Sequence, residues 1–229
     1  MIDSQQGEGA ALLRLMQLVS PALPVGAYAY SQGMEHGVHA GWLRDEDSAG
    51  EWIVGLLRQP LGHIDVPVLA RLYAAWRGGE DGALLHWSAY LRASRESREL
   101  QEENRQLGMA LARLLRDLGV NAAASWIQHP HVGLAILFSL AAVHWRIPLE
   151  AVAQGYLWSW AENQVAAAIK LIPLGQTAGQ RILTRVGEAI PAIVTAGLSM
   201  ADDDMGFATQ RLAIGSALHE EQYCRLFRS

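Results

Sequence analysis

Residues 93–118 read ASRESRELQEENRQLGMALARLLRDL, a pattern typical of an amphipathic α-helix. Leucines recur on one helical face at residues 100, 107, 111, 114, 115 and 118. The opposite face is made of Arg95, Glu96, Arg98, Glu99, Glu102, Glu103 and Arg105. This run predicts a solvent-facing surface with the i,i+4 pairs Arg95–Glu99 and Arg98–Glu102.

The same helical period extends over most of the chain, and strand alternation is nearly absent. Proline and glycine positions delimit further predicted helices at 12–19, 45–57, 66–76, 84–91, 132–145, 149–172, 177–193 and 209–223. Residues 149–172 are apolar on nearly all sides and predict a long central helix. Pro191 is expected to end or kink its helix. The sequence therefore predicts an all-α, single-domain bundle of roughly eight to ten helices. Residues 1–8 and 223–229 are expected to be its flexible ends.

Composition excludes several classes of protein. The chain has 229 residues, 51% of them hydrophobic, which is enough for one buried core. Its net charge of -5 disfavours a nucleic-acid binder. Cys224 is the single cysteine, so no internal disulfide forms and a reducing, cytoplasmic location is expected. The N-terminus shows no signal-peptide pattern. The apolar run 132–143 is shorter than the roughly 20 residues of a membrane span, so no membrane insertion is expected.

The sequence offers no recognisable catalytic centre. The one lysine, Lys170, is not part of a phosphate-binding P-loop, so no nucleotide hydrolysis of that kind is expected. Cys224 lies too near the chain end to be a well-positioned nucleophile. The carboxylate pairs Glu102–Glu103 and Glu220–Glu221 show no sign of a low-dielectric setting.

The eight histidines do not form a strong metal signature. His36 and His39 could share a helix face, and His129 and His131 could offer two ligands from one loop. Neither pair has the spacing of an established motif. We therefore expect no tight metal site in the monomer.

Four segments are unusual in ways that helical periodicity does not explain. They read SPALPVGAYAYSQGME (20–35), RESREL (95–100), WSWAENQ running on to KLIPLGQ (158–176) and HEEQYCRLFRS (219–229). Each is short, but all four resemble, in order, segments of the UreF family of urease accessory proteins. The resemblance extends over residues 13–229.

This resemblance implies an all-α fold, a homodimer and a non-enzymatic role as an assembly chaperone. It implies a complex with UreD (also called UreH) and the GTPase UreG, in which apo-urease is activated by GTP-dependent nickel insertion. Nickel would be handled by the assembled complex, with no cofactor tightly bound to this chain. Two rival classes stay open: an all-α enzyme with a buried small-molecule pocket, and a dedicated nickel-binding protein.

The resemblance also implies partner-binding residues in the tyrosine-bearing loop, near Lys170 and at the C-terminus. They are Pro24, Gly26, Tyr28, Ser31, Glu35, Lys170, Gln222, Tyr223, Arg225, Leu226 and Phe227. Tyr28 and Arg225 are expected to face UreG, and the C-terminal residues to become ordered against UreD. Ala29, Glu221 and Cys224 depart from the residues usual in the family, which affects hydrogen bonding within these motifs.

Two further expectations concern the C-terminal segment, residues 223–229, and Lys170. Tyr223, Leu226 and Phe227 fall at i, i+3 and i+4, so the segment either folds back or awaits a partner. We expect it to be poorly ordered alone, so that its removal acts on affinity and not on folding. Lys170 is expected to pair specifically with Glu162 or a helix-end carbonyl; a snorkelling surface site is the alternative.

Overall fold

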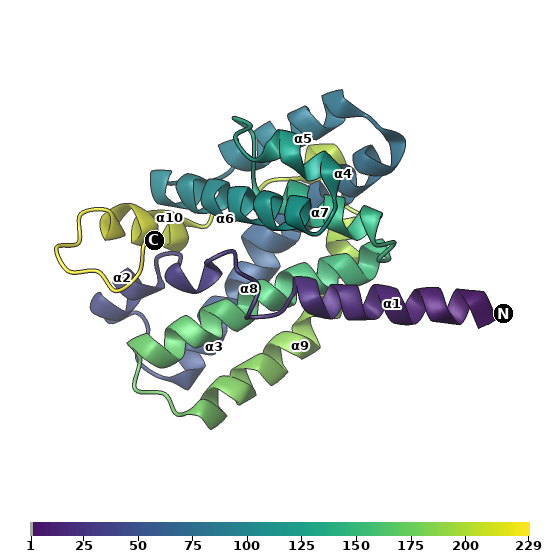
Figure 1. The fold of residues 1–229 in the computed structure, drawn as a ribbon. Helices are drawn as coiled ribbons and strands as arrows, with labels where there is room; N and C mark the ends of the chain where they lie inside the picture. Colours follow the sequence, from purple (N-terminus) through teal and green to yellow (C-terminus); the bar gives the residue numbers. More distant parts are fainter. Residues whose placement is uncertain (1) are drawn as a thin grey trace.

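The computed structural model describes residues 2–229, with side chains from residue 9 onward, and within that range it contains α-helices and no strand (Figure 1). The ten α-helices are α1 Ile2–Leu18, α2 Met34–His39, α3 Glu46–Leu56, α4 Val66–Gly78, α5 Asp81–Ala93, α6 Arg98–Asp117, α7 Leu134–His144, α8 Leu149–Leu171, α9 Gln176–Leu198 and α10 Gln210–His219. Short 3-10 turns lie at Ala27–Ala29, Asn121–Trp126 and Asp202–Asp204. The all-α prediction is confirmed.

Local capping residues fix where the helices begin and end. Asp45 caps α3 in a reciprocal capping box with Ser48. Ser97 caps α6 by accepting from the Leu100 amide at 3.1 Å, so this helix begins five residues later than its apolar pattern suggested. Gly119, just past its other end, has a φ of 88°, in the left-handed region that glycine adopts readily.

The segment after α3 departs from the prediction that the helix ends before Pro60. The chain continues as a π-helix, η2, over Leu57–Asp65 and passes directly into α4. A proline inside an α-helix clashes with the carbonyl four residues earlier, and the wider π spacing relieves that clash. The consequence is that Asp65, at the end of η2, is buried in the core.

Of the two alternatives for Pro191, that it ends its helix is wrong, because α9 runs through it to Leu198. Pro191 itself is exposed, while Ile190, Ile193 and Val194 on both sides of it are buried. Packing of that apolar face holds the helix together despite the one missing amide donor.

Two helices form the centre of the bundle. In α7 every residue from Ala135 to Ala142 is buried, against α4, α6 and α8. The 23-residue α8 packs along α9 and also contacts α1, α2, α3, α4 and α7. Glu150 in its first turn and Lys170 in its last turn are exposed, so α8 is not apolar all round.

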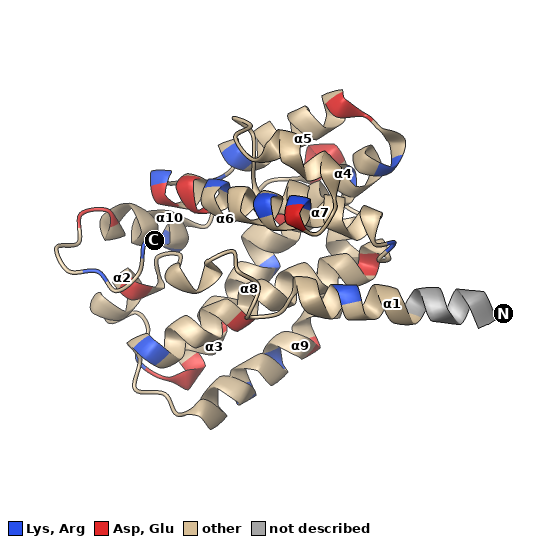
Figure 2. Cartoon of the chain, viewed as in Figure 1, with Lys and Arg blue, Asp and Glu red and all other residues tan. Residues whose placement is uncertain are grey.

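The two ends of the described chain lie far apart. In Figure 1, α1 projects from one side of the bundle, while the C-terminal segment lies beside α2, α6 and α10 at the other. Charged residues are frequent on α6 and near the C-terminus (Figure 2). No helix among the described residues is long and apolar enough to cross a membrane. The side chains of residues 1–8, which were predicted to be a flexible end, are not among those that the structure describes.

Candidate partner-docking site

The C-terminal segment folds back onto the body of the protein, which is the first of the two alternatives for it. Its backbone bends and is not helical, so the i, i+3, i+4 spacing does not form an apolar helical face. The Arg228 amide donates to the Ala29 carbonyl at 2.8 Å. Ser31 donates twice to the Ser229 carbonyl, from its amide at 2.9 Å and from its hydroxyl at 2.6 Å. The chain end therefore pairs with the segment just before α2.

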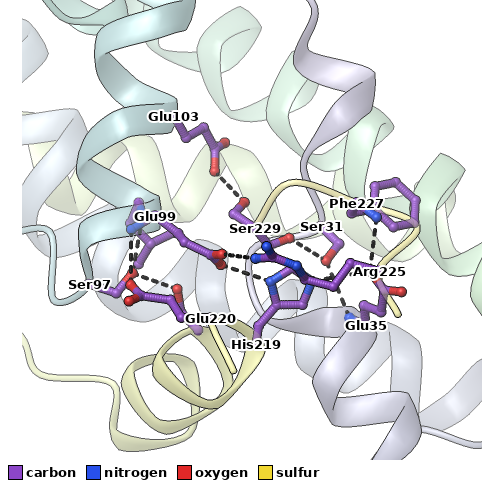
Figure 3. Close-up of polar contacts among 12 residues, drawn as sticks. Ser31, Glu35, Ser97, Glu99, Glu103, His219, Glu220, Arg225, Phe227 and Ser229 are labelled. Atoms are coloured by element: carbon purple, nitrogen blue, oxygen red, sulfur yellow. Dashed lines mark hydrogen bonds and ion pairs between the residues drawn. The ribbon is translucent and has the colours of Figure 1, made fainter. Parts of the chain in front are cut away.

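Glu35, in the first turn of α2, accepts two backbone hydrogen bonds from the segment. The Leu226 amide donates to one carboxylate oxygen at 2.7 Å, and the Phe227 amide donates to the other at 2.9 Å (Figure 3). Gly33 lets α2 begin this close to α10, since a Cβ there would lie 3.0 Å from the Ser216 amide nitrogen. One carboxylate thus binds two consecutive amides of the chain end.

His219, the last residue of α10, lies between two carboxylates and is fully buried. Its Nε2 is 3.1 Å from a Glu35 oxygen, and its Nδ1 is 2.8 Å from a Glu99 oxygen (Figure 3). The other Glu99 oxygen accepts from the Arg225 guanidinium at 2.7 Å. Ser97 and Ser216 hold α6 against α10, with their hydroxyl oxygens 2.5 Å apart.

Glu103 contradicts the prediction of a fully solvated face on α6, because it is only 5% exposed. Its carboxylate accepts from Gln32 Nε2 at 2.8 Å and from the Ser229 hydroxyl at 2.9 Å. Burial raises the pKa of Glu103 to about 7, although the hydrogen bonds from Gln32 and Ser229 act in the opposite direction. Ser31, Glu35, Glu99, Glu103 and His219 together form what we call the C-terminal seat.

Neither predicted i,i+4 pair on α6 forms. Arg95 instead makes a two-pronged ion pair with the buried Asp65, at 3.0 and 2.5 Å. Asp65 also accepts from the Tyr156 hydroxyl at 3.0 Å. Glu102 pairs with Arg105 at 2.8 Å on the exposed surface. Tertiary partners therefore replace the local ones wherever a charge of this helix faces inward.

A cavity of about 70 Å³ adjoins the seat. Tyr28, Gln32, Glu103, Trp160 and Gln164 are among the residues that line it. Gln32 links its two walls, because it donates to Glu103 and accepts from Trp160 Nε1 at 2.9 Å. The Glu103 carboxylate in this wall is held by two donors of the same chain, Gln32 and Ser229.

The structure brings together some of the predicted partner-binding residues but not all of them. Ser31, Glu35, Arg225, Leu226 and Phe227 converge at the seat. The exposed residues are Pro24, Tyr28, Lys170, Tyr223, Arg225 and Leu226, and the partly buried ones are Gly26, Glu35 and Gln222. No described hydrogen bond joins Tyr28 to Arg225, so the two residues expected to face one partner are not directly linked.

Phe227 is covered by this chain itself, since it is only 6% exposed. Its ring lies beside Lys170, with the ammonium 5.8 Å from the ring centroid. The predicted pairing of Lys170 with Glu162 or a helix-end carbonyl is not found among the described contacts. Lys170 is an exposed side chain whose neighbour is the returning C-terminal segment.

The described histidines, cysteine and carboxylates do not gather in threes in a metal-binding arrangement. His36 packs edge-on against Trp42, and His39 is exposed. His129 Nδ1 accepts from the His131 amide at 3.2 Å, which uses one of the two candidate ligand atoms. The cluster at His219 places its carboxylates at different ring nitrogens, so they do not converge on one point.

Sequence reasoning missed His219, Glu99, Glu103, Gln32 and Ser229 as members of the site. All five lie within, or directly beside, the four segments that carried the family resemblance. The available signal was that an interrupted charge pattern on an amphipathic helix places some charges toward the interior. Periodicity alone did not say which ones.

The comparisons with known proteins agree with the motifs. The UreF family model matches residues 43–187. The chain is 50% identical to the urease accessory protein UreF of Alkalilimnicola ehrlichii over 228 residues, covering 100% of both chains. It is 48% identical to that of Chromohalobacter salexigens, over 98% of this chain and 97% of the relative. It is 46% identical to that of Hahella chejuensis, over 96% of this chain and 98% of the relative.

Proposed function

The chain belongs to the UreF family of urease accessory proteins, and from this premise we propose that it is a non-enzymatic assembly factor in urease maturation. In this proposal it forms a complex with UreD and the GTPase UreG, which activates apo-urease by GTP-dependent nickel insertion. Nickel is cargo of the assembled complex and no cofactor is held by this chain. We also propose that it works as a homodimer in the cytoplasm, where its single cysteine stays reduced.

The docked C-terminal segment is the observation that carries this proposal. The seat fixes the backbone of Leu226 and Phe227 through Glu35. The same geometry leaves the side chains of Tyr223 and Leu226 exposed, with Arg225 between them. Tyrosine and arginine side chains are enriched at interface hot spots, and contiguous exposed apolar patches mark interaction sites. A surface held in place in this way suits recognition by a protein partner.

The buried acidic groups support an assembly role over an enzymatic one. Asp65 is neutralised by Arg95 and accepts from Tyr156. Glu103 is held by Gln32 and Ser229. Each therefore has a structural partner within the chain, as expected of groups that hold a fold or a docking surface together.

The test is co-purification with UreD and UreG, followed by urease activation with nickel and GTP. The variant Tyr223→Ala/Leu226→Ala removes exposed side chains and leaves the contacts of the seat intact. We expect it to melt like the wild type but to lose most complex assembly and urease activation, because its lost contacts lie outside the folded core. Leu85→Ala, at an exposed apolar position on α5, is the control and should assemble normally.

Two results would contradict the proposal. One is normal assembly and activation with the double variant. The other is GTP hydrolysis by the purified chain free of UreG, since that activity would have to come from residues assigned here to structure.

A further inference from the structure

The charges of the seat balance only if His219 is protonated. Two nearly buried carboxylates, Glu35 and Glu99, face two cationic candidates, His219 and Arg225. Arg225 contacts only Glu99. Without a charge on the imidazole, Glu35 would lie at the interface of α2 and α10 with no cation against it. A nearly buried carboxylate that accepts only backbone amides is less well compensated than one that also faces a cation.

The hydrogen-bond geometry leads to the same protonation state. A neutral imidazole has one N–H and one lone pair, whereas an imidazolium donates from both nitrogens. Both nitrogens of His219 face carboxylate oxygens, at 2.8 and 3.1 Å. A carboxylate cannot donate, so a neutral ring would direct a lone pair at one of these oxygens.

The two carboxylates that His219 bridges are also the groups that bind the chain end. Glu35 accepts the amides of Leu226 and Phe227, and Glu99 accepts Arg225. Through these contacts the imidazolium sets the separation and orientation of every charged acceptor used by residues 225–227. His219 makes no described hydrogen bond to the segment itself, so any effect on docking is indirect.

We propose that His219 is a charged positioning residue: its imidazolium holds Glu35 and Glu99 in the geometry that docks the C-terminal segment, and loss of that charge releases the segment. The seat is then a pH-dependent clasp for the surface that carries Tyr223, Arg225 and Leu226. The link to assembly rests on the proposed function, whereas the docking equilibrium is a property of this chain alone.

Other titratable and charged groups surround the clasp and have to be separated from His219. On α2 the neighbour is His36, whose pKa is lowered by burial and by His39 and His219. On α6 it is Glu103, which accepts from Ser229. Glu220 follows His219 and accepts from the Glu99 amide at 3.3 Å, and Arg225 comes from the segment.

The single cysteine provides a direct readout of docking. Cys224 is exposed and lies within the segment, so a nitroxide attached there reports segment mobility without further mutation. Hydrogen exchange at the Leu226 and Phe227 amides, the two donors to Glu35, reports the clasp itself. Both measurements use the isolated full-length chain.

We expect His219→Gln to increase the exchange of these two amides by roughly tenfold or more, as for loss of a charge-assisted contact. The nitroxide should become mobile in the same variant. In the wild type, raising the pH until NMR shows a neutral His219 ring should mobilise the label. The same pH series in Glu103→Gln should keep this transition, which separates it from ionisation of Glu103.

His36→Gln is the matched control, because it removes the neighbouring histidine and leaves the seat intact. It should dock the segment like the wild type. The proposal is overturned if His219→Gln folds and keeps its label mobility and amide protection. If that variant does not fold, the wild-type pH series decides: a segment that stays docked while NMR shows a neutral His219 overturns the proposal.

Assembly with UreD and UreG is measured separately. Normal docking without assembly would count against the proposed function and leave the clasp standing. Assembly that is unaffected while His219→Gln releases the segment would support the clasp and remove its link to partner binding.

Discussion

Two clusters of carboxylates and cations in this protein have similar chemistry and different consequences. In the interior, Asp65 is 1% exposed and is bound by Arg95 and Tyr156, with the three residues contributed by η2, the segment before α6, and α8. At the edge, the seat binds a chain end through Glu35, Glu99 and His219. There Arg225 is still 41% exposed.

The difference between them is how much of the protein must move for the contacts to open. The interior cluster is held on three packed elements, so it opens only when the core does. Burial, reinforced by the charge of Asp65, raises the pKa of Tyr156 well above its ordinary value and keeps it a donor. The seat opens when seven terminal residues detach, which is a local event of lower free energy. The first cluster therefore serves the fold, and the second suits docking.

Breaking the interior cluster should have the largest effect. Arg95→Ala leaves Asp65 buried without its cation, and we expect the free energy of unfolding to fall by about 3–5 kcal/mol. Urea unfolding measures it. Arg98→Ala, an exposed arginine three residues away, is the control and should change stability by less than about 0.5 kcal/mol. Equal losses of unfolding free energy in the two variants would show that the buried Arg95–Asp65 pair contributes no more to stability than an exposed arginine does.

Glu103 lies between the two cases, since it is buried like Asp65 but bound by the chain end like Glu35. Its pKa, raised by burial to about 7 from an ordinary 4.5, means that the folded state holds a proton that the unfolded state releases. Stability from this group is therefore present at low pH and is lost as pH rises from about 4.5 to about 7. The slope should approach 1.4 kcal/mol per pH unit.

Glu103→Gln should flatten that part of the stability profile, measured by urea unfolding at a series of pH values. Glu102→Gln, on the exposed surface next to it, serves as the control and should keep the wild-type slope there. A wild-type profile that is already flat between about pH 5 and about pH 7 would mean that Glu103 is solvated when folded.

Breaking the seat should act locally. Glu35→Ala removes the acceptor of two amides, so exchange at Leu226 and Phe227 should rise by roughly tenfold or more. The free energy of global unfolding should fall by only about 1–2 kcal/mol, less than for Arg95→Ala. Hydrogen exchange resolved to these amides gives the first quantity, and urea unfolding gives the second. If Glu35→Ala lowers the free energy of global unfolding as much as Arg95→Ala does, the seat does not open separately from the core.

The smallest effect is expected at Lys170. Its ammonium lies over the Phe227 ring at an exposed position, where a cation–π contact contributes about 0.5–1 kcal/mol. A guanidinium makes the same kind of contact. The free energy of unfolding of Lys170→Arg should therefore be within about 0.5 kcal/mol of the wild-type value. Lys170→Ala should loosen the segment slightly in the nitroxide measurement. Strong loss of stability in Lys170→Arg would instead support the specific pairing of Lys170 that was predicted from the sequence.

The helical architecture could be predicted well from the sequence. The 3.6-residue period, capping at Asp45 and the glycine at Gly119 are local signals, and they placed most helices to within a few residues. The two prolines were the main errors. Pro60 lies in a π-helix and Pro191 inside α9, because packing of neighbouring apolar side chains outweighed a local breaking signal.

The sequence by itself determined the all-α fold, the family and the segments in which the candidate site lies, because helix periodicity and motifs are properties of neighbouring residues. Only the tertiary structure decided which charges become partners. Glu103 and Ser229 are 126 positions apart, and Glu35 and His219 are 184 apart. The α6 pattern offered Glu99 and Glu102 local arginines, but desolvation favours whichever partner the fold brings to the buried side. That choice depends on how α2, α6 and α10 meet, and it turned a predicted solvated face into the seat of the C-terminal segment.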